Sequence, residues 1–349
     1  SHIMSTDLLL SISDLKVSFG NQLVLNGLNL SVRPGETVAL VGESGSGKSV
    51  LARSILGLVG PGGRVEGQID FLGRQLTSLP ESALTKLRGA EISLMVQDSQ
   101  SALNPAYRIG GQIMEMLALK RPEFSSKPGL FRRGSSSRKD YRNRLKQMAL
   151  EMLLEVDMND PEECFYAFPH QLSGGMRQRA TLAMAMLSDP KLLIADEPTT
   201  ALDVVIQKQI LRRLVQGARK RSSAVILISH DLHLVGELAD SLVVLYAGKI
   251  MEYGPTFSVL NNPGHPYTRA LSSVMPQPDS PGGSLKPIWG EAPPPEKRDQ
   301  GCLFRERCEQ ADAHCSAAPD YLPLGPNWAT LCHYPSADGQ EKISPTLAA

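Results

Sequence analysis

Apolar and polar positions alternate over the start of the chain and then give way to a continuously apolar run. Residues 8–12 and 15–19 alternate in the manner of edge strands, and residues 24–32 follow after a Gly20-Asn21 turn. Residues 37–41 read TVALV, which is typical of a strand buried on both faces. The pattern therefore predicts several strands within the first part of the chain.

A glycine-rich loop, GESGSGKS, follows this buried run directly, and residues 49–58 then have helical spacing. Strand, glycine-rich loop and helix in this order are the context that a phosphate-binding loop requires, which argues against a chance match in a turn. The glycines let backbone N–H groups turn toward phosphate oxygens, Lys48 supplies positive charge to the β and γ phosphates, and Ser49 can ligate Mg²⁺. We therefore expect a nucleoside triphosphate to be bound by Gly42, Ser44, Gly45, Gly47, Lys48 and Ser49.

Two further buried-strand runs occur at residues 191–195 and 224–228. The polar residues that end these runs are Asp196-Glu197 after the first and Ser229-His230-Asp231 after the second. Strands that alternate with helices imply an α/β sheet with parallel strands, whose ligands bind at the carboxyl ends of the strands. We therefore expect these polar side chains to face the ligand.

The two carboxylates after the first run suit the hydrolysis of a nucleotide. Asp196 can provide a second contact to Mg²⁺, and Glu197 can act as the base that polarises the attacking water. Adjacent acidic residues are commonly no more than surface residues. Their position directly after a buried strand, downstream of a phosphate loop, favours the catalytic interpretation.

A second helix start with exposed N–H groups follows Leu172. Ser173 would cap a helix over residues 177–187, and Gly174 and Gly175 expose N–H groups at its positive end. An ordinary N-cap explains this sequence as well. Since the chain already has a phosphate loop, we interpret the helix start as facing the γ-phosphate of another subunit in a head-to-tail dimer.

Strand patterns disappear between roughly residues 98 and 180, where helical patterns dominate, and we interpret this segment as a helical insertion in the α/β domain. Within it, residues 120–146 contain ten Lys and Arg residues against two acidic ones, with GSSS at 134–137. This composition predicts a mobile surface loop, either a solvated linker or a contact with lipid head groups or a protein partner.

The chain becomes rich in proline from about Asn261, which favours extended, non-helical structure and predicts an appended region. Four of the five cysteines fall there, spaced as Cys302-x5-Cys308-x6-Cys315-x16-Cys332. In a reducing cytosol such a group is more often a metal or cluster site than a disulfide framework, although it lacks the close C-x2–4-C pairs typical of structural zinc. Cys164 is most simply a buried core residue.

The overall composition is that of an ordinary soluble globular protein, with 349 residues of which 42% are hydrophobic and 21% charged. Lys plus Arg equals Asp plus Glu at 36 each, which argues against bulk nucleic-acid binding. No run approaches the roughly 18 apolar residues that would span a bilayer. Residues 1–3 resemble a cloning remnant ahead of a native Met4 and show no signal-peptide pattern, so we expect a cytosolic protein.

Taken together, these motifs resemble the ATP-binding cassette (ABC) transporter ATPases from Leu8 to about Gly254. The matching motifs, in family order, are the phosphate loop Gly42 to Ser49, the Q-loop Gln97, the signature LSGGM at 172–176, the carboxylates Asp196 and Glu197, the D-loop ALD at 201–203 and the switch His230. Met176 departs from the family, whose signature usually ends in Gln, while Ser173, Gly174 and Gly175 are intact.

The resemblance implies an α/β fold, namely a P-loop NTPase (RecA-like) core with an antiparallel β subdomain and a helical insertion, plus a small cysteine-containing C-terminal extension. The organisation that we predict is a remnant at 1–3, an ABC ATPase core at 4–97 and 181–260, a helical subdomain at 98–180 and the extension at 261–349.

The same resemblance implies roles for three more residues. Phe19 looks like the A-loop aromatic residue that stacks on adenine, with a core Phe as the alternative. Gln97 would hold Mg²⁺ or the lytic water and link the core to the helical insertion. His230 would bond the γ-phosphate and sense its loss. Since every residue needed for hydrolysis is present, we expect an active ATPase that uses ATP and Mg²⁺.

Further stretches resemble the dipeptide/oligopeptide (and nickel) importer branch of this family. They are QDSQSALNP at 97–105, PHQLSGGMRQR at 169–179, HPYTRAL at 265–271 and GCLFRERC at 301–308, with Ser99 where the branch more often has Pro. Some C-terminal extensions in this branch carry a [4Fe-4S] cluster. Cys302, Cys308, Cys315 and Cys332 suit such a cluster, with zinc or unliganded thiols as the alternatives.

Members of this branch work as two ATPase subunits, often non-identical, beneath two membrane permeases that an extracytoplasmic solute-binding protein feeds. The resemblance thus implies a peripheral protein at the cytoplasmic face of the inner (cell) membrane that energises peptide uptake and binds no nucleic acid. One alternative is a nickel or metallophore importer with the same chemistry. Another is a soluble, non-transport ABC protein, although such proteins usually carry two cassettes or a long coiled-coil insertion.

Overall fold

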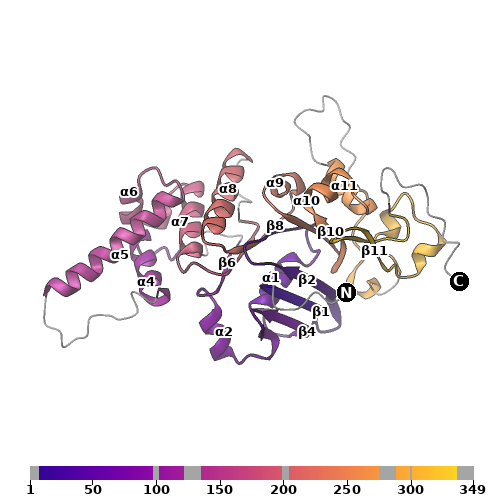
Figure 1. Cartoon of the computed structure of the whole chain (residues 1–349), viewed down its shortest axis with the longest axis horizontal. Helices are drawn as coiled ribbons and strands as arrows, with labels where there is room; N and C mark the ends of the chain where they lie inside the picture. Colours follow the sequence, from indigo (N-terminus) through magenta and orange to yellow (C-terminus); the bar gives the residue numbers. More distant parts are fainter. Residues whose placement is uncertain are drawn as a thin grey trace.

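The computed structural model describes residues 8–96, 102–121, 135–198, 204–274, 288–298 and 301–335. Figure 1 shows an elongated molecule, with the helices between residues 109 and 186 at one end and the residues after 300 at the other. The sheet whose strands precede the nucleotide motifs lies between these two ends. Gln97 and the D-loop at 201–203 lie outside the described residues.

An eight-stranded sheet forms the centre of the molecule, in the order β11-β12-β10-β9-β3-β8-β7-β6. Its strands are β3 (Thr37–Val41), β6 (Ile92–Met95), β7 (Leu192–Asp196), β8 (Ala224–Ser229), β9 (Ser241–Tyr246), β10 (Lys249–Pro255), β11 (Tyr321–Gly325) and β12 (Trp328–Leu331). From β9 through β6 neighbouring strands are parallel, and β10, β12 and β11 continue the sheet antiparallel. The predicted α/β sheet with parallel strands is confirmed.

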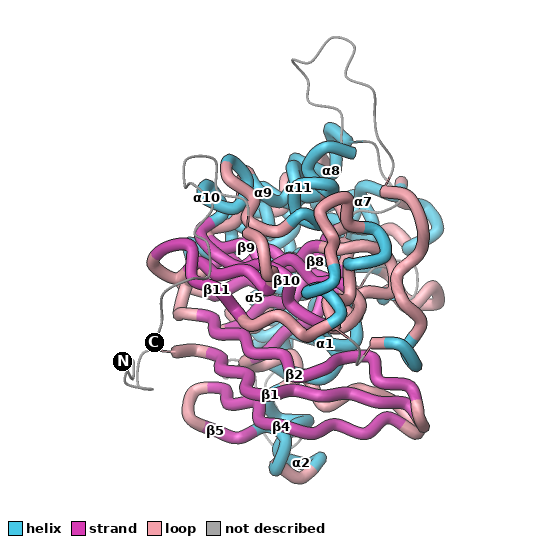
Figure 2. Tube along the Cα trace, turned by 90° about the vertical axis from the view of Figure 1, so that its right-hand side faces the viewer, coloured by secondary structure: helices cyan, strands magenta, loops and turns pink. Residues whose placement is uncertain are grey.

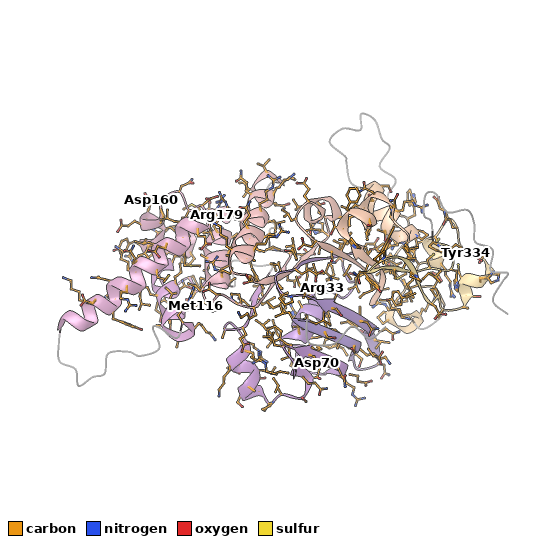
Figure 3. All side chains as sticks on the ribbon, in the orientation of Figure 1. Arg33, Asp70, Met116, Asp160, Arg179 and Tyr334 are labelled. Carbon is orange, nitrogen blue, oxygen red and sulfur yellow. The ribbon has the colours of Figure 1, made fainter. Side chains whose placement is uncertain are left out.

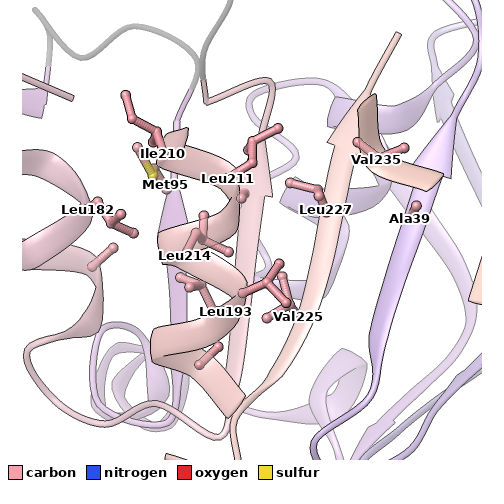
Figure 4. Close-up of a cluster of buried hydrophobic side chains, with 14 of the residues drawn as sticks. Ala39, Met95, Leu182, Leu193, Ile210, Leu211, Leu214, Val225, Leu227 and Val235 are labelled. Carbon is pink, nitrogen blue, oxygen red and sulfur yellow. The ribbon is translucent and has the colours of Figure 1, made fainter. Parts of the chain in front are cut away.

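Every residue of β3, β7 and β8 is buried, because both faces of this sheet are covered. Successive side chains of β3 enter different cores, Ala39 on the face covered by helices and Val38 on the face covered by a second sheet. Figure 4 shows the helical face, where Leu211 and Leu214 of α8 (Val204–Lys220) lie over the strands. A strand buried on both faces reads as a continuous apolar run, which is why the sequence revealed these three.

The second sheet has four antiparallel strands in the order β2-β1-β4-β5 and lies below the main sheet in Figure 2. Its strands are β1 (Leu10–Phe19), β2 (Gln22–Val32), β4 (Gly63–Phe71) and β5 (Arg74–Gln75). The two runs expected as edge strands are one strand, β1, which lies inside the sheet and is interrupted by an irregularity at Asp14, whose φ is 47°. The expected antiparallel β subdomain is confirmed.

The remaining elements are helices and short 3-10 turns. The helices are α1 (Lys48–Ile55), α2 (Glu81–Leu87), α4 (Ile109–Lys120), α5 (Ser135–Glu155), α6 (Pro161–Tyr166), α7 (Gly174–Met186), α9 (Leu232–Gly236), α10 (Thr256–Asn261) and α11 (Pro266–Val274). The 3-10 turns are η1 (Leu76–Ser78), η3 (Pro169–Gln171), η4 (Pro295–Lys297), η5 (Arg305–Arg307) and η6 (Ala313–Ser316). No described helix is both long and apolar enough to cross a membrane.

The basic segment at 120–146 is only partly the loop that its composition predicts. Residues 135–146 begin α5, so the prediction of a loop is wrong there, while residues 122–134 lie outside the described part. The later part of this helix has buried apolar residues at helical spacing, namely Leu145, Ala149 and Met152. Their packing stabilises a helix that the serines alone would disfavour. In Figure 3 the labelled residues Asp160 and Met116 lie at this helical end of the molecule, and Tyr334 lies at the opposite end.

The prediction of non-helical structure after Asn261 is also wrong for residues 266–274, which form α11. The later residues are tied to the central sheet, because β12 pairs with β10. The fully buried carboxylate of Glu252 accepts hydrogen bonds from the backbone N–H groups of Gly264 and His265 and from the indole N–H of Trp328. A buried carboxylate needs such donors, so these contacts hold the extension on the sheet.

Candidate functional site

The glycine-rich loop joins the end of β3 to the start of α1. Gly42 has φ 153° and Gly47 has φ 107°, and a Cβ atom would lie 2.1 Å from the Leu245 carbonyl oxygen at the first and 2.4 Å from Leu25 Cδ2 at the second. Glycine is therefore required at both positions for backbone conformation and for space. The loop consequently curls tightly over the end of the sheet. Two of its N–H groups are engaged within the protein, that of Glu43 by the Tyr267 hydroxyl and that of Ser46 by the Glu43 carbonyl.

The ammonium group of Lys48 lies inside this loop. Its Nζ donates hydrogen bonds to the carbonyl oxygens of Gly42 and Glu43 at 2.8 and 2.9 Å. Burial lowers the pKa of Lys48, and the nearby carboxylates, Glu197 and Asp196 among them, act in the opposite direction. A buried cation among carbonyl oxygens is well placed to turn toward a phosphate group.

Ser49 and Asp196 come together at the next position. Ser49 Oγ donates a hydrogen bond to Asp196 Oδ1 at 3.0 Å. Burial raises the pKa of Asp196, and the hydrogen bond from Ser49 opposes that shift. A hydroxyl and a carboxylate oxygen side by side are ligands suited to Mg²⁺ that is also bound to phosphates.

Glu197 and His230 face each other next to this pair. The carboxylate of Glu197 lies 3.7 Å from His230 Nδ1, and its side chain is 18% exposed against 58% for His230. Both residues line a small cavity that also touches Gln207 and Ser229. Because β3, β8 and β7 are adjacent and parallel, their carboxyl ends bring the loop, His230 and the two acidic residues to one edge.

The predicted signature residues lie elsewhere in the chain. Ser173 Oγ accepts a hydrogen bond from the Met176 N–H at 3.3 Å and so caps α7, as expected. α7 packs on α4, α5, α8 and β6, whereas α1 packs on β7 and β2. The two helices lie apart in both Figure 1 and Figure 2, so Ser173, Gly174 and Gly175 are not brought to the phosphate loop of the same chain.

Phe19 is the last residue of β1 and is half-buried. It packs against the apolar core of the β subdomain, and its ring approaches Gly63 of β4 closely. This position is compatible with a core residue that leaves part of its ring open to a base.

The four late cysteines line one small cavity, together with His265 and Phe304 among others. All five cysteines of the chain are free thiols. The backbone N–H of Tyr334 donates to Cys332 Sγ at 3.4 Å. Burial nevertheless raises the pKa of the Cys332 thiol to about 12 and also raises that of Cys302 and Cys308.

The described residues around this cavity form no site for a single metal ion. Thiolates around a single zinc ion lie roughly 3.8 Å apart, since each Zn–S bond is about 2.3 Å. No three His, Cys, Asp or Glu side chains of the described residues are arranged to hold one metal ion. An iron–sulfur cluster binds each thiolate to a different iron, so its ligands are spread more widely, and N–H···S hydrogen bonds are usual around it.

Sequence reasoning missed Arg307 and Tyr267, which both contact Glu43 in the phosphate loop. They occur in two of the stretches that resemble the importer branch, GCLFRERC and HPYTRAL. Nothing in those stretches indicates a partner more than two hundred residues earlier.

Family models match both the part of the chain that contains the phosphate loop and its C-terminal region. A model described as "ABC transporter" matches residues 25–200, and a model described as "Oligopeptide/dipeptide transporter, C-terminal region" matches residues 251–315. A third, described as an AAA domain, matches residues 168–236.

Known proteins resemble the chain over nearly its whole length. It is 41% identical over 333 residues to the oligopeptide transport ATP-binding protein OppD of Escherichia coli (strain K12), with 94% of each chain covered. It is 39% identical over 336 residues to the dipeptide transport ATP-binding protein DppD of the same strain, with 95% of this chain and 98% of that one covered.

Among solved structures, a dimeric ATP-binding cassette in a post-hydrolysis state, bound to ADP and Pi, has a TM-score of 0.58 and 24% identity. The match covers 71% of this chain and 98% of that one, and it shows that the two share a fold. With the phosphate loop, the acidic pair and the histidine at one sheet edge, these likenesses lead to one conclusion: the chain belongs to the ABC transporter family, among its ATP-hydrolysing ATP-binding proteins.

Proposed function

We propose that this chain is the ATP-binding subunit that energises the import of dipeptides or oligopeptides. The observation that carries this proposal is the match of residues 251–315 to the C-terminal region of oligopeptide/dipeptide transporters, on a chain about 40% identical to proteins named for that transport. The transported substrate does not bind at the nucleotide site, so the geometry of that site does not distinguish one substrate from another. The choice of peptides as substrate is therefore supported by the likeness of the whole chain to peptide transport proteins.

In this proposal the sheet edge is the ATP site. The loop from Gly42 to Ser49 binds the phosphates, Ser49 and Asp196 hold Mg²⁺ with Gln97, and Phe19 stacks on adenine. Glu197 polarises the attacking water. The 3.7 Å separation of Glu197 and His230 supports a joint role, in which His230 senses the γ-phosphate next to the base.

The site is completed by a second ATPase subunit, which we propose to be a non-identical one. The separation of α7 from α1 supports a second subunit, because Ser173, Gly174 and Gly175 then have a phosphate to bind only in another subunit. That this subunit is a non-identical one rests on the resemblance to the importer branch alone. ATP binds the closed dimer more tightly than the open one, so binding closes the dimer and hydrolysis reopens it. The division into core, helical subdomain at 98–180 and extension at 261–349 belongs to the same proposal.

The remaining partners are two membrane permeases and an extracytoplasmic solute-binding protein, and the chain lies peripherally at the cytoplasmic face of the membrane. Residues 98–180 would transmit closure to the permeases. We also propose that Cys302, Cys308, Cys315 and Cys332 hold a [4Fe-4S] cluster. The support is their shared cavity and the N–H group that donates to Cys332 Sγ. The cluster would cross-link the C-terminal extension and so stabilise it, because the extension is too small to build a core of its own.

The test is capture of the tagged chain from detergent-solubilised membranes, followed by ATPase assays of the captured complex in liposomes. We expect permeases to be captured and turnover to rise when the solute-binding protein carries a peptide, with the Glu197→Gln complex as the inactive control. Stimulation by nickel or a metallophore but not by peptides would contradict the proposal that the cargo is a peptide. Turnover stimulated by nucleic acid, with no permease captured, would contradict transport altogether.

A further inference from the structure

The guanidinium group of Arg307 has all of its N–H donors engaged. Its Nη1 and Nη2 donate to Glu43 Oε2 and Oε1 at 2.8 and 2.9 Å, which is a bidentate ion pair. Nη1 also donates to the Tyr246 hydroxyl, Nη2 to the Ile288 carbonyl and Nε to the Trp289 carbonyl. The Arg307 side chain is only 5% exposed, whereas that of Glu43 is 29% exposed, so the cation of the pair is shielded from water. Such a fully bonded arginine holds its partner in one geometry.

Glu43 is thereby held at three points. Its carboxylate is bound by Arg307, its backbone N–H donates to the Tyr267 hydroxyl at 3.0 Å, and its carbonyl accepts from Lys48. Tyr267 is fully buried in α11 and therefore cannot move far. Glu43 is the second residue of the phosphate loop, so two residues of the C-terminal region fix the point where that loop leaves β3.

The same two residues lie beside the cysteine cavity. Arg307 directly precedes Cys308, and Tyr267 follows His265 by two residues. The ring of Phe304, which lines the cavity, contacts the rings of both Tyr267 and His265 and lies under the Arg307 guanidinium. The cysteine region therefore contacts the phosphate loop through Arg307 and Tyr267, and the ring of Phe304 packs against both of these residues.

We propose that Arg307 is a positioning residue for ATP binding, which neutralises and immobilises Glu43 so that the phosphate loop accepts a polyphosphate. A carboxylate in a phosphate-binding loop repels the anionic ligand, and pairing with a shielded cation removes that repulsion. Affinity for ATP then depends on the C-terminal region, although the loop itself belongs to the N-terminal part of the chain. This inference rests on the assignment of Gly42 to Ser49 as the phosphate loop.

The test compares the ATP and ADP affinities of purified full-length variants by calorimetry. Arg307→Met should weaken ATP binding on the order of tenfold and ADP binding less, since the repulsion grows with ligand charge. Adding Glu43→Gln to Arg307→Met should restore affinity to within about twofold, because no carboxylate is then left to repel the ligand. Arg305→Met is the matched control, since Arg305 lies on the same turn and has no described hydrogen bond or ion pair with the loop.

Each outcome decides one point. If Arg307→Met binds ATP normally while Lys48→Ala does not, the inference is wrong and the phosphate-loop assignment stands. If Lys48→Ala also binds normally, the assignment itself is wrong. A double variant as weak as Arg307→Met would mean that Arg307 acts through packing and not through Glu43, which overturns the proposal. Should Arg307→Met not fold, Arg307→Lys serves instead, with a smaller expected loss because a lysine keeps the charge without the bidentate geometry.

Discussion

Ser49 donates a hydrogen bond to Asp196 at 3.0 Å although 147 residues separate them. Ser49 follows β3 and Asp196 ends β7, and β8 lies between these strands in the sheet. Their carboxyl ends therefore define one edge, and the sheet itself sets the distance from the phosphate loop to the acidic pair. Glu197, the residue after Asp196, is positioned at the same edge by its backbone N–H, which donates to the Ile228 carbonyl at 3.1 Å.

Replacing Glu197 by Gln should leave ATP binding intact and nearly abolish turnover, by at least about a hundredfold. The amide keeps the shape of the side chain but cannot accept a proton from the attacking water. Phosphate release in the reconstituted complex measures turnover, and calorimetry measures binding. Unchanged turnover would remove Glu197 as the base.

Replacing Lys48 by Ala should weaken ATP binding strongly, because the loop loses the cation that now bonds the Gly42 and Glu43 carbonyls. The expected loss is on the order of a hundredfold in affinity, as for a charged hydrogen bond in a shielded site. Lys86→Ala, at an exposed position of α2, is a control that should bind as the unaltered chain does. Wild-type affinity of the Lys48 variant would discredit the phosphate loop.

The proposed [4Fe-4S] cluster predicts a brown protein after anaerobic purification, with roughly four iron and four sulfide per chain. Cys308→Ser should lower the iron content and the visible absorption, whereas Cys164→Ala should change neither, because Cys164 is buried in α6 of the helical region. Colorimetric iron and sulfide assays give the result. A colourless, iron-free protein would defeat the cluster proposal, and zinc found in its place would support the zinc alternative.

Arg221 should stabilise the fold at neutral pH and lose that effect in acid. It bonds Glu155 at the end of α5 and Asp189 before β7, so it joins the helical region to the sheet. The hydrogen bond from Arg221 lowers the pKa of Glu155. A carboxylate with a lowered folded-state pKa contributes stability above its ordinary pKa, and this stability is lost as the pH falls through the lowered value.

Arg221→Met should therefore lower the free energy of unfolding by about 2 kcal/mol at pH 7 and by less near pH 3, as urea titrations at the two pH values would measure. Arg212→Met is the control, because Arg212 is about half exposed (52%) in its ion pair with Glu237. We expect that control to change stability by no more than about 0.5 kcal/mol. An equal loss in both variants, or a loss that does not depend on pH, would argue against the Arg221–Glu155 pair.

Local patterns predicted three of the eight strands of the central sheet and the candidate residues at their ends. The buried strands at 37–41, 191–195 and 224–228 are continuous apolar runs, and their terminal residues carry the phosphate loop, the acidic pair and His230. Composition misled where packing decides the outcome. The serines at 135–137 begin a helix because later residues of α5 bury an apolar face, and the region after Asn261 contains α11 and a hairpin that extends the main sheet.

By itself, the sequence determined that this protein binds a nucleoside triphosphate and predicted which residues would surround it, because those motifs are short and each depends on neighbours in the chain. Only the tertiary structure decided that the C-terminal region contacts the phosphate loop. Arg307 and Glu43 are 264 residues apart, and each belongs to a local motif that gives no sign of the other. Their contact depends on β12 pairing with β10 and on α11, whose Tyr267 hydroxyl accepts a hydrogen bond from the Glu43 N–H, and no local pattern encodes such an arrangement.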